Sequence, residues 1–285
     1  MVGRHSMTNR YAVPAKIAKY VVDSEDNRKR EPTLIRLEQH GPCAVVYLDR
    51  PQAMNALDAG AMTELETVLA RLATGDARAL IVTGAGERAF SAGADVAELG
   101  ERDAEAVRAA SRRGQALGLA IEALPMPSIA LLNGYALGGA LELALCCTFR
   151  LATPQATLGF PEIKLGVSTG WGGTQRLPRL IRTQDALDLL MSGRMIDAQE
   201  AVRLGVAHAI VDGLEGALEF ARRFTANSLV AMAFVRQAVC GARDTSLEWG
   251  LEVETDISVQ SYATEDATEG IAAFLAKRPP VFHDR

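Results

Sequence analysis

The chain has 285 residues, of which 48% are hydrophobic and 23% are charged, a composition typical of a globular protein with a substantial core. Its formal net charge of -5 provides no basic field for a nucleic acid or an anionic membrane. Gly, Glu or Arg interrupts every apolar run before the roughly 20 residues that a membrane-spanning helix needs, so we expect neither a nucleic-acid partner nor a membrane partner.

Residues 1–30 mix basic and acidic side chains and lack the apolar segment and cleavage pattern of a secretory signal. Asp23, Glu25 and Asp26 argue against a transit peptide, because such peptides are poor in acids. We therefore predict a flexible N-terminal extension, native only in part, with Met7 as a candidate true start.

Three short apolar runs bounded by turn residues predict buried strands at residues 44–48, 79–83 and 128–132. Between the first two strands, apolar residues recur at helical spacing over residues 58–73, where Asp58 is the expected N-cap. This alternation of strands and a helix indicates an α/β arrangement.

A long helix is predicted to start at Asp95 as its N-cap and to run towards residue 124, where Pro125 and Pro127 would end it. Two further short strands are expected at residues 149–152 and 157–160.

The last third of the chain has helical patterns only. Asp197 to Glu200 resembles a capping box, and Gly205 is the expected C-terminal glycine of that helix. Further helices are predicted at residues 214–226, 229–240, 246–263 and 265–276. The predicted organisation is thus an extension (1–30), an α/β core with the active site (31–213) and a helical region (214–285).

Two glycine-containing turns are candidate sites for an oxyanion. Gly138 and Gly139 open a short helix, whose first N–H groups have no partner within the helix. The small residues around Ala94 form a second such loop. We expect the amides of Ala94 and Gly139 to stabilise a developing negative charge, an effect worth about 3–4 kcal/mol per donor. Taken singly, each segment is better explained as a strand-to-helix turn, but their joint occurrence with two acids favours an oxyanion site.

Two glutamates are the candidate acid and base. Glu142 lies in a nearly all-apolar helix, where a carboxylate is expensive unless it has a partner; Arg150 or Arg176 is the alternative structural partner. Glu162 follows Pro161 in a glycine-flanked loop, where it could also cap a helix or face solvent. If both acids face one pocket, at least one pKa is raised and the pair can handle a water molecule.

Cysteine and histidine patterns argue against a metal site. The four histidines are scattered, and Cys43, Cys146, Cys147 and Cys240 lack the spacing of zinc ligands. We expect no metal and no separate cofactor. The cysteines favour a reducing compartment, and we expect a cytoplasmic protein.

Five segments in order carry a resemblance to a known family. They are LDRP and NAL within residues 48–57, FSAGAD at 90–95, NGYALGG at 133–139, PEI at 161–163 and GGTQRL at 172–177. In residues, order and spacing they resemble the enoyl-CoA hydratase/isomerase, or crotonase, superfamily, from about residue 34 to the C-terminus.

The resemblance implies a fold and a reaction. The implied fold is a spiral of ββα turns followed by helices that build trimers, often paired into hexamers, and the implied substrate is a CoA thioester. The oxyanion donors are then the amides of Ala94 and Gly139. In the hydratase branch, Glu142 activates a water that adds across an α,β double bond, and Glu162 protonates the α-carbon.

The resemblance also implies residues that bind the substrate. They are Gln52, Ala53, Met54, Ser91, Ala92, Asp95, Trp171, Gly172 and, from a neighbouring subunit, Lys277 near the CoA phosphates. Lys277 is alternatively a solvated helix end.

One departure concerns Thr169-Gly170-Trp171, where many hydratases have Pro-Gly and a small residue. An indole here could narrow the acyl pocket or simply pack the loop, and it also resembles some malonyl-type decarboxylases. The predicted function is enoyl-CoA hydratase. The alternatives are a malonyl-type acyl-CoA decarboxylase, an enoyl-CoA isomerase, or a non-catalytic RNA-binding or assembly protein.

Overall fold

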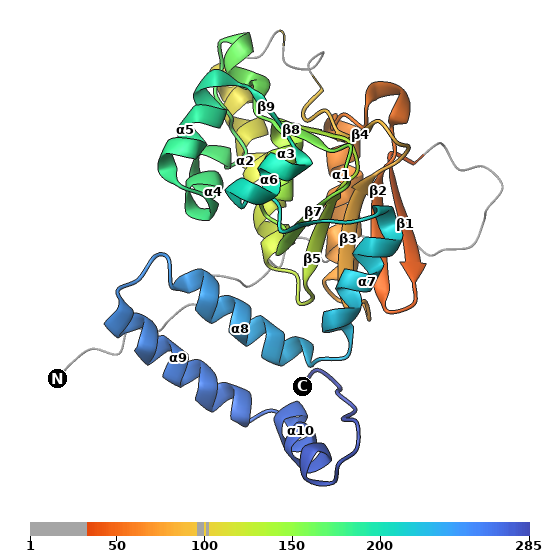
Figure 1. The fold of residues 1–285 in the computed structure, drawn as a ribbon, viewed down its shortest axis with the longest axis vertical. Helices are drawn as coiled ribbons and strands as arrows, with labels where there is room; N and C mark the ends of the chain where they lie inside the picture. Colours follow the sequence, from red (N-terminus) through yellow and green to blue (C-terminus); the bar gives the residue numbers. More distant parts are fainter. Residues whose placement is uncertain (1–32, 96–99, 101–102) are drawn as a thin grey trace.

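The computed structural model describes residues 33–95, 100 and 103–285 (Figure 1). The extension predicted for residues 1–30 lies outside this part of the chain.

A large, mostly parallel sheet forms the centre of the core. Its strands, in spatial order, are β1 (Ile35–His40), β2 (Cys43–Leu48), β3 (Ala79–Gly84), β5 (Ser128–Leu132), β7 (Phe149–Ala152) and β10 (Ala209–Ile210). Only β1 is antiparallel to its neighbour. The strands predicted from apolar runs are confirmed here, because strands buried on both faces leave a nearly continuous apolar signal.

A second, smaller sheet lies beside the first. Its order is β4 (Ala89–Ser91), β6 (Tyr135–Leu137), β8 (Thr157–Gly159) and β9 (Met195–Asp197), with β9 antiparallel. The chain alternates between the two sheets, so that β3 and β4 precede one helix and β5 and β6 precede the next. This repeated ββα turn is the predicted spiral.

Helices lie around the two sheets. They are α1 (Ala59–Leu72), α2 (Ala104–Glu122), α3 (Gly139–Ala144), α4 (Gly173–Leu180), α5 (Thr183–Ser192), α6 (Ala198–Leu204) and α7 (Gly213–Thr225), with short 3₁₀ helices η1 (Pro51–Ala53) and η3 (Pro161–Leu165). One apolar cluster joins one sheet face to α1, α2 and α3, and a second joins the other face to α7 (Figure 1).

The helix starts show which capping predictions hold. Asp58 caps α1, and Asp197 caps α6 by accepting from Glu200 N at 2.8 Å. The prediction that Asp95 caps the long helix is wrong. The cap of α2 is Asp103, and Asp95 instead pairs with Arg50 Nη1 at 3.1 Å, because its carboxylate neutralises that partly buried guanidinium.

The C-terminal helices project from the core (Figure 1). They are α8 (Leu229–Gly241), α9 (Leu247–Tyr262) and α10 (Glu265–Leu275), close to their predicted bounds, and Ser228, Ser246 and Thr264 cap them. Arg236 of α8 donates to the carbonyl of Met126 at 3.3 Å and thereby joins this helix to the core.

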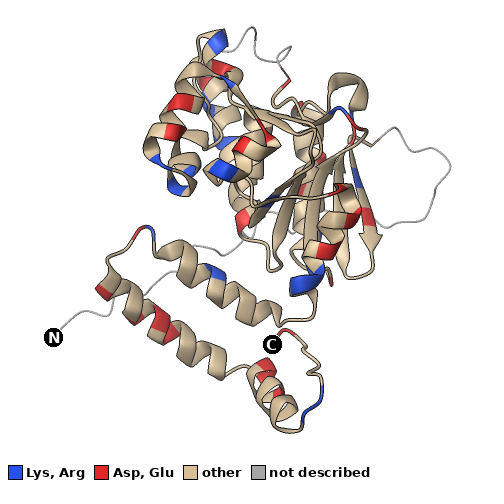
Figure 2. Cartoon of the chain, in the orientation of Figure 1, with Lys and Arg blue, Asp and Glu red and all other residues tan. Residues whose placement is uncertain are grey.

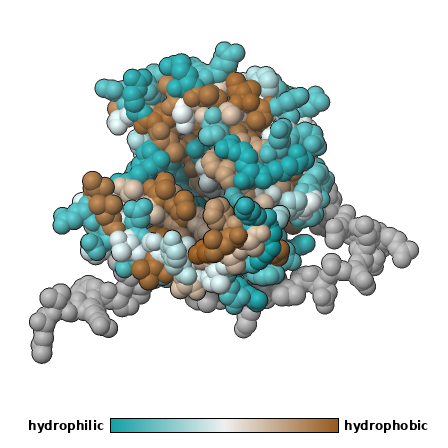
Figure 3. Space-filling view, turned by 60° about the horizontal axis from the view of Figure 1, so that its bottom comes forward, coloured by the Kyte–Doolittle hydropathy of each residue, from teal (hydrophilic) through white to brown (hydrophobic). Residues whose placement is uncertain are grey.

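Apolar side chains are exposed on these three helices, and Figure 3 shows them gathered on that side of the molecule. They are Val235, Val239, Leu247, Trp249, Leu251, Val259, Tyr262, Ile271, Phe274 and Leu275. Helix α9 carries Glu248, Glu252, Glu254 and Asp256 and no basic residue, as Figure 2 also shows.

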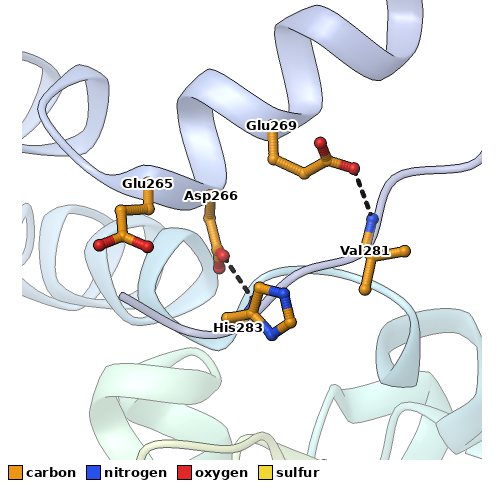
Figure 4. A pocket seen from close by; sticks show the side chains of 5 residues that line it. All are labelled: Glu265, Asp266, Glu269, Val281 and His283. Carbon is orange, nitrogen blue, oxygen red and sulfur yellow. Dashed lines mark hydrogen bonds between the residues drawn. The ribbon is translucent and has the colours of Figure 1, made fainter.

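The last residues of the chain fold back along α10. A pocket of about 200 Å³ lies between them, lined by Glu265, Asp266, Glu269, Val281 and His283 (Figure 4). Its acids already have partners: Asp266 accepts from the His283 amide at 2.7 Å, and Glu269 from the Val281 amide at 2.9 Å. The acids of this pocket therefore serve to hold the last residues of the chain against α10. In the described part of the chain no helix has the length and apolar character needed to cross a bilayer.

Candidate active site

Two neighbouring strands end together and bring the predicted oxyanion donors to one place. Ser91 of β4 is in register with Ala136 of β6, so Ala94 and Gly139 each lie three residues further along parallel paths. Gly93, with φ +91°, sits between them, and a Cβ at this position would lie only 3.2 Å from the Gly139 amide nitrogen. A glycine is therefore needed where the two loops approach.

The amides of Ala94 and Gly139 are available to a ligand. Leu57 donates to Gly93 O and accepts from Asp95 N, which turns the intervening Ala94 N–H away from Leu57. Gly139 is the first residue of α3, so its N–H has no acceptor within the helix. Among the described residues, neither N–H donates to a protein acceptor.

Glu142 is buried in α3 and held by backbone amides. Its side chain is enclosed, with a residue exposure of 1%, and its Oε1 accepts from Trp171 N at 2.8 Å and from Gly173 N at 2.6 Å. Burial raises the pKa of Glu142, and these amide hydrogen bonds oppose that rise.

The alternative of an ion pair for Glu142 is wrong. Arg150 donates to the carbonyls of Val206 and Cys147, and Arg176 pairs with Glu122 at 2.6 Å. The turn before α4 supplies enough N–H groups to satisfy the carboxylate without a cation.

Glu162 lies in the first turn of η3 and faces Gly138. A Cβ at Gly138 would lie 2.7 Å from Glu162 Oε1, and Oε2 is buried without a hydrogen-bond partner. Burial, together with the charge of Glu142, raises the pKa of Glu162 to about 7. The solvent-facing alternative is wrong, and the two carboxylates lie close enough to influence each other.

The loop around η1 packs against the strand that leads to Ala94. Met54 O accepts from Ala92 N at 2.9 Å, and Gln52 and Ala53 belong to the same turn. Ser91 is fully buried, with its hydroxyl accepting from Gly93 N at 3.1 Å, so its side chain shapes the loop.

Asn55 supports the site, although its sequence pattern did not predict a role for it. Its Oδ1 accepts from Arg50 N at 3.0 Å, and its Nδ2 donates to Ala89 O at 2.8 Å, which joins the η1 loop to β4. Its left-handed φ of 56° is a conformation that asparagine tolerates well. The sequence feature that could have indicated this role is a single asparagine, Asn55, between the predicted strand and the N-cap Asp58.

The segment before α4 brings Trp171 and Gly172 to the site. Trp171 is 8% exposed and packs in the core, while Gly172, with φ +119°, is the N-cap of α4. Thr169 Oγ1, two residues earlier, is buried without a partner.

Lys277 does not join this group within one chain. It is exposed, directly after α10, and Figure 1 shows α10 at the opposite end of the molecule from α3. The other predicted site residues lie on and just after η1, at the end of β4, on the segments that follow β4, β6 and β8, and on the turn before α4. A search of the described residues finds no cluster of three or more metal-ligating side chains.

The sequence model of the enoyl-CoA hydratase/isomerase family matches residues 38–285. The chain belongs to this family. Within it, the chain is 38% identical over 252 residues to a crotonyl-CoA hydratase of Syntrophomonas wolfei, which covers 87% of this chain and 97% of the relative. It is 36% identical over 246 residues to a short-chain-enoyl-CoA hydratase of Clostridium acetobutylicum, covering 85% and 94%.

Solved structures of the enoyl-CoA hydratase/isomerase family share the fold. The crystal structure of an enoyl-CoA hydratase from Bacillus anthracis superposes with a TM-score of 0.84 at 36% identity, covering 88% of this chain and 100% of that one.

Proposed function

We propose that this protein is an enoyl-CoA hydratase, which reversibly adds water to the double bond of a 2-enoyl-CoA thioester. The observation that carries the proposal is the meeting of two carboxylates, the buried Glu142 and the half-buried Glu162, beside two amides that have no acceptor among the described residues. The hydratases among the relatives support the same reaction.

The two amides bind the thioester oxygen and stabilise the enolate that forms when a nucleophile adds to the β-carbon. Glu142, whose Oε1 accepts hydrogen bonds from two amides, takes a proton from water as the hydroxide adds. Glu162, whose raised pKa of about 7 keeps it partly protonated near neutrality, gives its proton to the α-carbon. The proton gained by Glu142 then replaces the one that Glu162 lost, which restores the site.

The substrate partner is an acyl-CoA, and this chemistry needs no further cofactor. The η1 loop with Gln52, Ala53 and Met54 lies against Ala92. The pantetheine part of CoA, which leaves the thioester sulfur, would pass along this loop. Asp95 holds Arg50 in this loop. Such a reaction serves the metabolism of fatty acyl thioesters.

Assembly into trimers or hexamers would cover the apolar face of α8, α9 and α10. It would also allow Lys277 of one subunit to approach the CoA phosphates of another. A cytoplasmic location agrees with four cysteines that are all free thiols.

The test is hydration of crotonyl-CoA by the single variants Glu142→Gln and Glu162→Gln. Each should lower kcat about 10²- to 10⁴-fold, because each removes one partner in proton transfer. The matched control is Glu105→Gln, an exposed acid on α2. Activity that persists in both active-site variants would rule out this mechanism.

Mass spectrometry of the products separates the alternatives. Trp171 before Gly-Gly-Thr resembles malonyl-type decarboxylases, which would release carbon dioxide. An isomerase needs only one working acid, whereas two acids, Glu142 and Glu162, lie at this site. The acidic surface of α9 and the net charge oppose RNA binding.

A further inference from the structure

The Trp171 indole occupies the space beside the oxyanion site. A Cβ at Gly139 would lie 2.7 Å from Cε3 and 2.8 Å from Cζ3 of the ring, so the six-membered edge of the indole covers the Gly139 Cα. The same residue uses its backbone N–H to hold Glu142. Trp171 is therefore in direct contact with the parts of the site that handle the carbonyl and the water.

Helix α2 makes room for this ring. Gly114 is buried in the middle of α2, and a Cβ there would overlap the five-membered part of the indole. A glycine inside a helix costs about 1 kcal/mol relative to alanine. The indole fills the space that the missing side chain leaves between α2 and α3.

The direction of the acyl chain follows from the reacting atoms. The thioester oxygen must lie at the amides of Ala94 and Gly139, and the α- and β-carbons must lie within reach of Glu162 and Glu142. Carbons beyond the β-carbon then continue past Glu142. The segment that carries Trp171 contacts the Glu142 carboxylate through the amides of Trp171 and Gly173, and its indole lies beside Gly139.

We propose that Trp171 is the end wall of the acyl pocket and restricts the enzyme to short 2-enoyl-CoA substrates, with Gly114 as the site that accommodates the wall. This inference rests on the proposed function and names its substrate class. A methylene that cannot be buried forfeits the free energy of removing it from water, so the loss of affinity grows with each carbon beyond the wall.

A tryptophan that only packs the loop would behave differently. Its removal would lower stability and slow turnover of all chain lengths by a similar factor. An end wall, by contrast, changes the ratio between long and short substrates. The ratio is therefore the quantity to measure.

The experiment compares wild type, Trp171→Ala and Trp171→Phe with the trans-2-enoyl-CoA thioesters of four, six, eight and ten carbons. We expect wild-type kcat/KM to fall beyond six carbons. We expect Trp171→Ala to raise the ratio of eight-carbon to four-carbon kcat/KM by at least about tenfold, equivalent to about 1.4 kcal/mol. Trp171→Phe, a smaller ring that preserves much of the packing, should give an intermediate ratio and covers the case in which the alanine variant does not fold.

Calorimetric binding of butyryl-CoA and decanoyl-CoA provides a readout that does not depend on turnover. Decanoyl-CoA should bind wild type at least about tenfold more weakly, relative to butyryl-CoA, than it binds Trp171→Ala, and Trp171→Phe should again be intermediate. The matched control is Phe220→Ala, which removes a buried ring on the other face of the sheet. This control should lower the Tm and leave both ratios unchanged.

If wild type and the Trp171 variants had equal ratios of long-chain to short-chain kcat/KM, the proposal that Trp171 ends the pocket would be wrong. It would also be wrong if wild type turned over the ten-carbon substrate at the rate of the four-carbon substrate. Failure of the proposed function looks different, because wild type would then hydrate none of the four thioesters. The binding ratios would still decide whether Trp171 limits chain length.

Discussion

At the scale of single residues, Glu162 differs from an ordinary surface acid in keeping its proton up to neutral pH. Burial without a hydrogen bond to Oε2 raises its pKa to about 7, whereas its ordinary value is 4.5. Because the protonated form delivers the proton to carbon, we predict that kcat/KM for hydration falls as pH rises through about 7. A pH profile with crotonyl-CoA checks this. A rate that is flat from pH 6 to 9 would contradict the assigned role.

The same shift predicts a change in stability. Between pH 4.5 and about 7 the folded state binds the Glu162 proton more tightly than the unfolded state, so stability falls as pH rises through this window and remains lower above it. Glu162→Gln should therefore have a higher Tm than wild type at pH 8. The difference should disappear near pH 4, where the wild-type carboxyl is protonated in both states. Thermal melts at the two pH values test the prediction, and an equal Tm at pH 8 would refute it.

The sequence predicted which residues form the site better than it predicted their partners. Glu142 stood out because a charge in an apolar helix needs an explanation, but its partners are the amides of Trp171 and Gly173, far along the chain. A spacing pattern cannot identify backbone donors that only the folded turn brings near. The role of Asn55 was missed for the same reason, because its side-chain amide donates to the carbonyls of Ala89 in β4 and of Ala85 in the preceding turn.

At the scale of elements, length and burial decided what was predictable. Strands β2, β3 and β5 left nearly continuous apolar runs, whereas β4, β6 and β9 have three residues each and too few for a period. Helix α4 contains Pro178 and begins at a glycine, so it lacks the usual start signal and carries a residue that normally breaks helices. The second sheet, whose strands β4 and β6 lead to the two predicted oxyanion donors, was therefore accessible mainly through the family resemblance, apart from β8, which was predicted at residues 157–160.

The tail beyond α10 is held to the core by one acid. Asp284 accepts from Arg78 Nη1 at 2.7 Å and from the Leu229 amide at 2.7 Å, which joins the tail to β3 and to the start of α8. Burial alone would raise the pKa of Asp284, but these bonds lower it, so its stabilisation is present at neutral pH and is lost as pH falls below its ordinary value of 3.8.

We predict that Asp284→Ala loosens the C-terminal helices by about 1–3 kcal/mol, because Arg78 and the Leu229 amide lose a charged acceptor. Hydrogen exchange should become faster in α10 and at the start of α8, while α3 and the β6 amides keep their protection. Arg285→Ala, which removes only an exposed pair with Glu265, is the control. Unchanged exchange in α10 would show that the tail is held by other contacts.

At the scale of the whole molecule, the core is closed around its site while the C-terminal helices expose apolar side chains. Phe274 and Leu275 of α10 are 83% and 76% exposed, and monomers rarely leave such a cluster in water. We predict that wild type, with a chain mass of 30.4 kDa, sediments as a trimer or hexamer. Phe274→Glu with Leu275→Glu should dissociate it, because burying two carboxylates in an apolar interface is costly.

Light scattering after size exclusion measures the mass of wild type, of this double variant and of Val107→Glu, a control that places a charge at an exposed apolar position on α2. The double variant should approach the mass of one chain and the control should keep the wild-type mass. If subunits also share the CoA site through Lys277, dissociation should raise KM more than it lowers kcat, since Glu142 and Glu162 lie within one chain. A monomeric wild type would contradict assembly through these helices, and a monomeric variant with an unchanged KM would assign the whole substrate site to a single chain.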